Sequence, residues 1–294
     1  MSAGLEGFRE HLERTESPRT VLAYFADGAA FEAFRAGRPA GIDLYEAWAD
    51  SVNHGRCRPK TFARKKAGVN RWLAFLARHG DQEAARTLAI LHGGYKVGPQ
   101  VRPADRKRVE PVTPEEYRDA GARAPAWGRA LMALLWWAGP RISEVVGDPL
   151  AGIPALTVAD GRALASEGCT VTRGKGGKVR TLVLPAAIRG ELASWLDGRE
   201  PDSPLFPSPS NPGRPVTPQS VNAMLHQAGL RCGAHAFRHA YKARLRRAGV
   251  AEEVIRALMG HGPRSVTDNY GEPTIVELLA AVERLADSQE VDRT

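Results

Sequence analysis

The segment at residues 95–116 most constrains how this chain folds, because it separates two parts that must each bury a core of their own. It reads YKVGPQVRPADRKRVEPVTPEE, holds four prolines and has no regular spacing of apolar residues. Such a polar, basic and proline-containing stretch is typical of an exposed linker between domains. The sequence therefore predicts a first domain over residues 1–95, a linker over 96–112 and a second domain over 113–294.

The first domain is expected to be helical throughout. Four stretches space their apolar residues with the period of a helix, and several end at glycine. In the third stretch, Val69, Trp72, Leu73 and Leu76 form one stripe, with Lys and Arg side chains on the other side. The four stretches are residues 17–37, 42–52, 58–80 and 81–94.

The second domain is expected to be mainly helical with a small β-sheet. Thr113 and Glu116 form a capping box around Pro114, which predicts a helix start there. Short strands are expected in ALTVAD, CTVTRG and VRTLVLP, the last two joined by the turn GKGGK. The chain returns to helix after Pro185, and a proline-rich loop is expected over 201–218. Further helices are expected over 115–124, 127–138, 219–228, 234–248, 252–259 and 274–286.

Composition excludes several classes of protein. Apolar residues make up 43% of the chain, which suffices for a buried core. The run ALMALLWWAG is shorter than the roughly 18 residues that span a bilayer, so it predicts a buried helix. The N-terminus mixes both charges without a hydrophobic signal region, and export is not expected. Cys57, Cys169 and Cys232 form no CxxC pair, which argues against disulfides and zinc and fits a reducing cytoplasm.

The charge balance favours a polyanionic partner. The chain has 41 Lys and Arg against 33 Asp and Glu, a formal net charge of +8. Two basic runs flank the expected domain boundary, and we expect both to contact DNA phosphates; the alternative is that each is only a solvated face. The residues of these two runs that we expect to make such contacts are Arg56, Arg58, Lys60, Arg64, Lys65 and Lys66, then Arg106, Lys107 and Arg108.

Four separated features of the second domain have residues suited to chemistry. AGPRISEV has an arginine at a helix start, RGKGGKVR a lysine at a hairpin tip, HAFRH a histidine and an arginine three apart, and GHGPRSVTDNY a histidine and a tyrosine. These residues are Arg141, Lys175, His235, Arg238, His261 and Tyr270.

Each feature alone has a structural alternative. Arg141 could simply pair with Glu144, the Gly/Lys turn could be solvated, and Tyr270 could be a packed aromatic residue. His235 and His239 are spaced i, i+4, but no HExxH glutamate or other ligand supports them, so no metal is expected.

Together these residue types suit the cleavage of a phosphodiester. Two arginines can hold the phosphate oxygens and stabilise the charge that grows on them in the transition state. A tyrosine can attack the phosphorus, provided that neighbouring groups favour its phenolate over a phenol of pKa ~10. A mobile lysine can protonate the departing sugar oxygen.

The order Arg, Lys, HxxR, GH, Tyr resembles the catalytic domain of the tyrosine recombinases, the phage integrase family. AGPRISEV is similar to the family's first arginine box, and residues 233–270 are similar to its second box almost throughout. The resemblance covers residues 113–286, and residues 17–93 are similar to the family's helical core-binding domain in a less specific way. It implies an α+β catalytic domain that uses no metal, ATP or other cofactor.

The resemblance also implies roles. Arg141 and Arg238 would be the phosphate clamps, with Glu144 supporting them from behind. Lys175 would be the general acid, although residues 147–168 align poorly and Lys178 remains an alternative.

The remaining roles fall on the second box. His235 would be the acid/base beside the nucleophile, and His261 would hydrogen-bond the phosphate. Tyr270 would be the nucleophile, with Gly260 ending a helix so that His261 faces the phosphate. Pro140 stands where the family usually has leucine, which the geometry of a helix start tolerates.

The implied function is site-specific DNA recombination through a 3′-phosphotyrosyl link and a Holliday junction. Whether the enzyme serves as integrase, resolvase or element mobiliser stays open, as do accessory proteins or a partner recombinase. We expect a simple two-domain enzyme, without a further domain before the core-binding one. One alternative is a DNA-relaxing topoisomerase, against which the helical first domain argues. The other is a non-catalytic DNA-binding protein, against which the intact residue set argues.

The C-terminal stretch TIVELLAAVERLADSQE predicts an amphipathic helix. The resemblance implies that it docks into a neighbouring protomer and links four copies on the DNA. The alternative is that it packs on its own domain. Its apolar stripe consists of Ile275, Leu278, Leu279, Val282 and Leu285.

Overall fold

The structure is a computed structural model that describes residues 2–54, 57–98, 109–174, 177–261 and 272–291. The chain divides into two compact units, residues 1–108 and 109–294, which are described separately below. The division falls inside the segment expected to be a linker.

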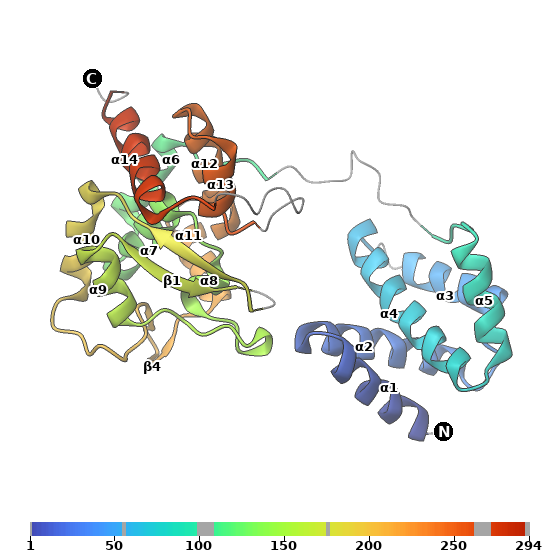
Figure 1. Ribbon diagram of the computed structural model, residues 1–294. Helices are drawn as coiled ribbons and strands as arrows, with labels where there is room; N and C mark the ends of the chain where they lie inside the picture. Colours follow the sequence, from blue (N-terminus) through green and yellow to red (C-terminus); the bar gives the residue numbers. More distant parts are fainter. Residues whose placement is uncertain (1, 55–56, 99–108, 175–176, 262–271, 292–294) are drawn as a thin grey trace. The chain divides into compact units, whose positions relative to one another are not determined.

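In its described residues the first unit consists of the helices α1 to α5 (Figure 1). They pack around a core rich in aromatic side chains. α4 contacts the other four helices, and its predicted stripe is buried at Val69, Trp72 and Leu73. Trp72 also packs edge-on against Phe8, with ring centroids 5.0 Å apart. The helices are α1 (Ser2–Thr15), α2 (Pro18–Arg35), α3 (Ile42–His54), α4 (Pro59–Arg78) and α5 (Gln82–His92).

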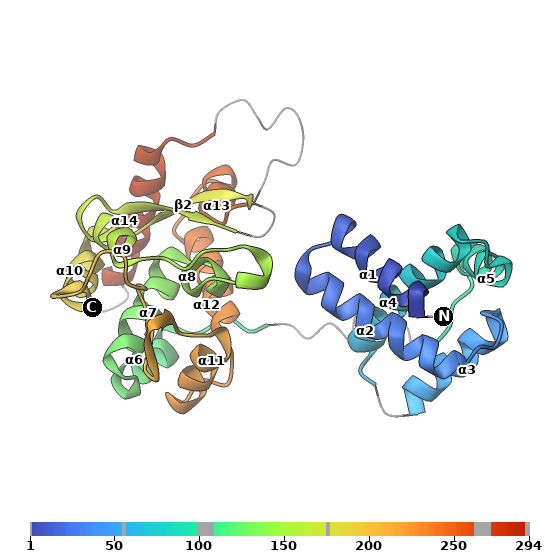
Figure 2. The same ribbon diagram turned by 90° about the horizontal axis from the view of Figure 1, so that it is seen from below.

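The second unit is built around α7 (Ala126–Ala138), which contacts α6, α10, α11 and α12 (Figures 1 and 2). From Leu131 onward α7 is apolar on every side and all of its residues are buried, as the run ALMALLWWAG predicts. The capping box of Thr113 and Glu116 is confirmed by reciprocal hydrogen bonds of 2.9 and 3.2 Å. The other helices are α6 (Pro114–Arg123), α8 (Ile142–Val146), a 3₁₀ turn (Pro149–Ala151), α9 (Val158–Ser166), α10 (Ala186–Leu196), α11 (Pro218–Gln227), α12 (Ala234–Arg247), α13 (Glu252–Leu258) and α14 (Ile275–Val291).

Two predicted strands form an antiparallel hairpin, β1 (Cys169–Arg173) and β2 (Val179–Val183). A second, short hairpin, β3 (Pro207–Ser208) and β4 (Asn211–Pro215), lies within the stretch predicted to be only a proline-rich loop. This hairpin is short and its register is irregular, so it has little of the alternating pattern that reveals strands in a sequence.

The prediction of a strand in ALTVAD, residues 155–160, is wrong. The helix α9 begins there instead, at Val158, and only an isolated bridge joins Thr157 to Pro204. Thr157 and Asp160 form a capping box, in which the carboxylate accepts from the Thr157 N–H at 2.8 Å and Asp160 N–H donates to the threonine hydroxyl at 3.3 Å. This local start signal outweighs the strand preference of the β-branched residues.

α14 packs on its own unit, against α12, α13 and β2. Leu278, Val282 and Leu285 from the predicted stripe are buried, whereas Ile275 at the start of the helix is 40% exposed. Glu283 fixes the helix by accepting a hydrogen bond of 2.9 Å from the Ala186 N–H. In this structure the helix thus has the intramolecular packing that the sequence offers as the alternative.

Candidate active site

The second unit has a pocket of about 400 Å³ where α8, the β1–β2 hairpin and the end of α13 meet. Its walls combine positive charge with one carboxylate, which suits an anionic ligand. The described residues that line it are Arg141, Glu144, Gly174, Lys178, Val179, Arg180, Gly260 and His261.

Arg141 is held at the entrance to α8 by Glu144. Gly139 ends α7 in the left-handed conformation (φ 57°), and the chain turns so that Arg141 precedes the first residue of α8. The Glu144 carboxylate accepts from the Arg141 main-chain N–H at 2.7 Å and from its guanidinium at 2.7 Å. The Glu144 side chain is 1% exposed and that of Arg141 40% exposed, so the carboxylate is buried behind a guanidinium that reaches solvent.

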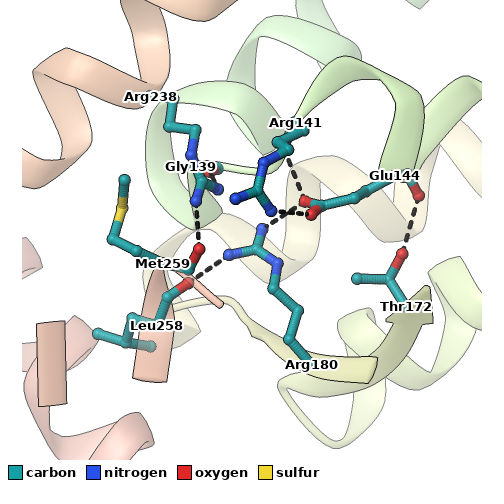
Figure 3. A network of polar contacts seen from close by, with 8 residues as sticks. All are labelled: Gly139, Arg141, Glu144, Thr172, Arg180, Arg238, Leu258 and Met259. Atoms are coloured by element: carbon teal, nitrogen blue, oxygen red, sulfur yellow. Dashed lines mark hydrogen bonds and ion pairs between the residues drawn. The ribbon is translucent and has the colours of Figure 1, made fainter. Parts of the chain in front are cut away.

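Arg238 lies deeper, on α12, and its side chain joins the ends of two other helices. Its guanidinium donates to the Gly139 carbonyl at 2.8 Å and to the Met259 carbonyl (Figure 3). Burial, with Arg180 and Arg141 nearby, lowers the pKa of Arg238 to about 9, so it remains a cation at neutral pH. A guanidinium has five N–H donors, and these two contacts fix its plane while leaving others for a ligand.

Gly260 and His261 complete a Schellman motif at the end of α13. The Gly260 N–H binds the Ala257 carbonyl at 2.9 Å, and the His261 N–H binds the Arg256 carbonyl at 3.0 Å. Gly260 adopts φ 58°, a conformation that favours glycine. The motif turns the chain so that His261 lines the pocket, as the spacing of glycine and histidine implies.

Both candidate histidines favour the neutral form. Burial, then Arg238, Lys242 and Arg141, lowers the pKa of His261. The His235 side chain remains accessible to solvent, but partial desolvation of its ring, then the charges of His239, Arg238 and Arg141, lower its pKa. His235 is exposed on the first turn of α12 and its ring lies 4.8 Å from that of His239, but it is not among the residues that line the pocket.

Several predicted site residues lie outside the described part of the chain. Lys175 and Tyr270 are among them, whereas the alternative lysine, Lys178, is described, exposed and part of the pocket wall. The basic residues Arg56, Arg106, Lys107 and Arg108 also lie outside the described residues.

Arg180 belongs to the site and was not predicted from the sequence. Its side chain is 5% exposed and extends from β2 to the Glu144 carboxylate, with Nη2 3.0 Å from Oε2. A second nitrogen donates to the Leu258 carbonyl (Figure 3). A signal did exist, because alternation along VRTLV places Arg180 on the same strand face as the buried Leu182. A charge on a buried face requires a partner.

The basic run at the start of α4 is uneven. Arg58 and Lys60 are exposed, whereas Arg64 forms an ion pair with Asp27, which is 5% exposed. Lys65 and Lys66 are half-buried, and burial lowers the pKa of Lys66. These contacts make Arg58 and Lys60 the described members of the run that are most accessible to a large ligand.

Among the described residues, no helix has the length and apolar character needed to cross a bilayer. The same part of the chain brings together no group of three His, Cys, Asp or Glu side chains that could hold a metal ion.

The mainly helical fold, the arginine-rich pocket with its GH element and the HxxR element on α12 together characterise a DNA strand-cleaving and rejoining enzyme of the tyrosine recombinase class. The chain belongs to the phage integrase family, which matches residues 114–274. It is a site-specific recombinase, and the family and the mainly-α fold predicted from the sequence are confirmed.

Individual relatives resemble the chain over nearly its whole length. The tyrosine recombinase XerC of Erythrobacter litoralis is 31% identical over 96% of this chain and 91% of its own. The tyrosine recombinase XerD of Caulobacter vibrioides is 28% identical over 88% of this chain and 87% of its own. The solved Tn1549 transposon integrase (residues 82–397), in complex with circular intermediate DNA, shares the fold with a TM-score of 0.61, at 17% identity over 99% of both chains.

Proposed function

We propose that this recombinase cleaves one strand at a time, with Tyr270 as the nucleophile. The Tyr270 hydroxyl oxygen would bond to the phosphorus while the bond to the 5′ oxygen breaks. The products would be a 3′-phosphotyrosyl link and a free 5′-hydroxyl. Attack by a 5′-hydroxyl from the partner duplex would reverse the step and form a Holliday junction. One phosphoester bond replaces another at each step, so no external energy source is required.

The observation that carries this proposal is the convergence of Arg141, Glu144, Arg180 and His261 on one pocket, with Arg238 directly behind it. A phosphodiester gains negative charge on its equatorial oxygens as the tyrosine attacks. Arg141 is exposed enough to bind those oxygens, and its fixed position means that little reorganisation is needed when the charge grows. We assign Arg238 as the second clamp.

The histidines and the hairpin lysine would move protons. The lowered pKa of His235 leaves it neutral at pH 7, so it can accept the proton that Tyr270 loses. His261 is neutral for the same reason and would donate a hydrogen bond to a phosphate oxygen. A lysine of the hairpin, Lys175 with Lys178 as the alternative, would protonate the departing 5′ oxygen.

The test is covalent capture. The full-length protein is incubated with a nicked recombination site, denatured and run on a gel to detect a protein–DNA adduct. Tyr270→Phe should bind the site and form no adduct; an adduct from this variant would refute the assignment of the nucleophile. EDTA should leave the wild-type rate unchanged, and loss of activity in EDTA would refute a metal-free reaction.

Arg141→Ala is the cleaner test of the phosphate clamp. Arg141 is partly exposed, and Glu144 would keep Arg180 and the main-chain N–H of residue 141, so Arg141→Ala should abolish cleavage, leave DNA binding nearly intact and lower the melting temperature less than Arg238→Ala does. Arg238→Ala should abolish cleavage as well, but it also removes hydrogen bonds to the ends of α7 and α13 and should lower the melting temperature. Normal cleavage by Arg141→Ala would refute its role as a clamp.

We further propose that the first unit binds DNA through the start of α4. The exposed Arg58 and Lys60 support this surface, because cations there can approach phosphates without losing an internal partner. Arg56 and the residues Arg106, Lys107 and Arg108 would extend it. Because its substrate is DNA and its three cysteines suit a reducing compartment, we place the protein in the cytoplasm.

Four protomers assembled on two DNA sites would be the active form, with α14 exchanged between neighbours. The helix now packs on its own unit through Leu278, Val282 and Leu285, and the same apolar face could fill the equivalent site of a neighbour. A chain cut after Pro273 should then bind one half-site but lose cooperative filling of the full site. Gel shifts on one and two half-sites, with a thermal melt, test this. Normal cooperativity, or unfolding of the cut chain, would refute the exchange. Recombination of two sites by the purified protein alone would show that it needs no accessory protein and no partner recombinase.

A further inference from the structure

We propose that Arg180 is a positioning residue of the cleavage site, which holds the Arg141–Glu144 pair, the lysine hairpin and the turn before His261 in one fixed arrangement. The proposal deepens the assignment of the cleavage site and rests on it. It depends on contacts of the Arg180 side chain with two separate segments, α8 and the end of α13, and on the place of Arg180 at the base of the lysine hairpin.

The first contact is with Glu144, and it is made by both members of a cross-strand pair. Thr172 on β1 lies opposite Arg180 on β2, and both side chains face α8. The Thr172 hydroxyl donates to the Glu144 main-chain carbonyl at 2.9 Å, while the Arg180 guanidinium reaches the Glu144 carboxylate. The hairpin therefore holds Glu144 at both its backbone and its side chain.

The Glu144 carboxylate contacts two arginines, Arg141 and Arg180. Oε1 accepts from the Arg141 guanidinium, and Oε2 accepts from the Arg141 N–H and lies 3.0 Å from Arg180 Nη2. The ion pair with Arg180 holds Oε2, so the Glu144 carboxylate cannot turn to place both of its oxygens on the Arg141 guanidinium. Arg180 thereby sets the orientation of the carboxylate that fixes the guanidinium of Arg141 (Figure 3).

The second contact is with the end of α13. Arg180 donates to the Leu258 carbonyl, three residues before His261. Its aliphatic stem also lies against Gly260, where an added Cβ would come within 2.5 Å of Arg180 Cδ. The position of the turn that presents His261 therefore depends on where the Arg180 side chain lies.

The third connection is through the main chain. Arg180 is the second residue of β2, two residues after Lys178 and five after Lys175. Fixing its side chain to α8 and α13 anchors the base of the hairpin next to the segment that holds both candidate lysines. A displacement of about 1 Å in a catalytic group can cost on the order of 100-fold in rate, so such anchoring matters to cleavage.

Lysine should not replace Arg180. With separate nitrogens the guanidinium forms an ion pair with Glu144 and a hydrogen bond with the Leu258 carbonyl, on two different elements. The lysine ammonium is instead a compact charge on a flexible stem. A role limited to positive charge would be rescued by Arg180→Lys. A role in bridging would not be rescued.

The experiment measures single-turnover adduct formation at saturating protein on a nicked site, with a thermal melt for each variant. We expect Arg180→Lys and Arg180→Met to bind the site within about twofold of wild type but to cleave about 100-fold more slowly. The matched control is Arg244→Met. Arg244 is also buried, at 4% exposed, and donates to a main-chain carbonyl, that of Trp136, but it does not line the pocket. This control should lower the melting temperature and cleave at the wild-type rate.

A double-mutant cycle with Glu144→Gln tests the route of the effect. If Arg180 acts through Glu144, the double variant should cleave at about the rate of the slower single variant rather than at the product of the two losses. Wild-type cleavage by Arg180→Lys, or fully multiplicative losses, would overturn the proposal. If Arg180→Met does not fold, the cleavage rate and the double-mutant cycle are both measured with Arg180→Lys. Failure of the wild-type protein to form any adduct would instead count against the proposed cleavage reaction.

Discussion

Replacing Gly260 with alanine should destabilise the second unit by more than its backbone conformation alone explains. Gly260 has φ 58°, and left-handed backbone costs an alanine about 1–2 kcal/mol. The new Cβ would also lie 2.5 Å from Arg180 Cδ and 3.4 Å from its Cβ and Cγ. Relieving that overlap requires displacing a side chain that is 5% exposed, and overpacking of this kind costs about 1–3 kcal/mol. The expected total is about 2–5 kcal/mol.

The chain provides a matched control in Gly249. It follows α12 in the same Schellman motif, with its N–H on the Arg246 carbonyl and the Val250 N–H on the Leu245 carbonyl. Its φ is 68°, close to that of Gly260, but nothing lies within 4 Å of an added Cβ. Gly249→Ala should therefore cost only the backbone contribution of about 1–2 kcal/mol.

The assay is urea unfolding of both variants, followed by circular dichroism through the transition of the second unit, together with the cleavage rate. Gly260→Ala should lose more stability than Gly249→Ala by about 1–3 kcal/mol and should also cleave slowly, because Arg180 moves. Equal losses of stability in the two variants would refute the inference that Gly260 is required by its contact with Arg180.

Two further expectations follow from the described side chains. The pKa values of His235 and His261 are lowered below 6.5, so the unfolded chain takes up their protons at higher pH than the folded protein does. Their contribution to stability is thus present above pH 6.5 and is lost as the pH falls through 6.5 toward the pKa values of the folded protein. Because both histidines are neutral near pH 7, the cleavage rate should not change with pH there. A loss of rate with a midpoint above pH 6.5 would contradict this. On α4, Arg58→Gln and Lys60→Gln should each reduce the log–log salt slope of DNA binding by about one unit per lost phosphate contact. Arg64→Gln should instead lower the melting temperature, because Asp27 would be left buried without its partner. Unchanged slopes for the Arg58 and Lys60 variants would show that this part of the run is only a solvated surface.

The sequence predicted the regular helices well, because they combine helical apolar spacing with clear start and stop signals. α6 and α7 are examples, the first with its capping box and the second with Gly139 at its end. ALTVAD failed because three β-branched or apolar residues resemble a strand, while the deciding capping box depends on Thr157 and Asp160 together. The first domain was expected to be helical throughout, but no separate helix was predicted for α1, although Leu5, Phe8 and Leu12 have helical spacing.

The site was predictable only where residues follow one another in recognisable motifs. Arg141 with Glu144, and Gly260 with His261, are local pairs whose spacing already implies their contact. Arg180 was missed because its partners, Glu144 and Leu258, are distant in sequence and meet only through the fold. The roles of Lys175 and Tyr270 stay predictions, since both lie outside the described residues.

The charge of the pocket has a practical consequence for work with the purified protein. Three guanidinium groups, those of Arg141, Arg180 and Arg238, face one carboxylate, that of Glu144, which leaves two positive charges around the same small volume. Sulfate, phosphate and citrate carry the complementary charge and are small enough to reach Arg141. We expect these buffer ions to compete with the scissile phosphate, so that cleavage is slower in phosphate than in chloride at equal ionic strength. The choice of counter-ion would then alter the apparent activity of an otherwise unchanged preparation.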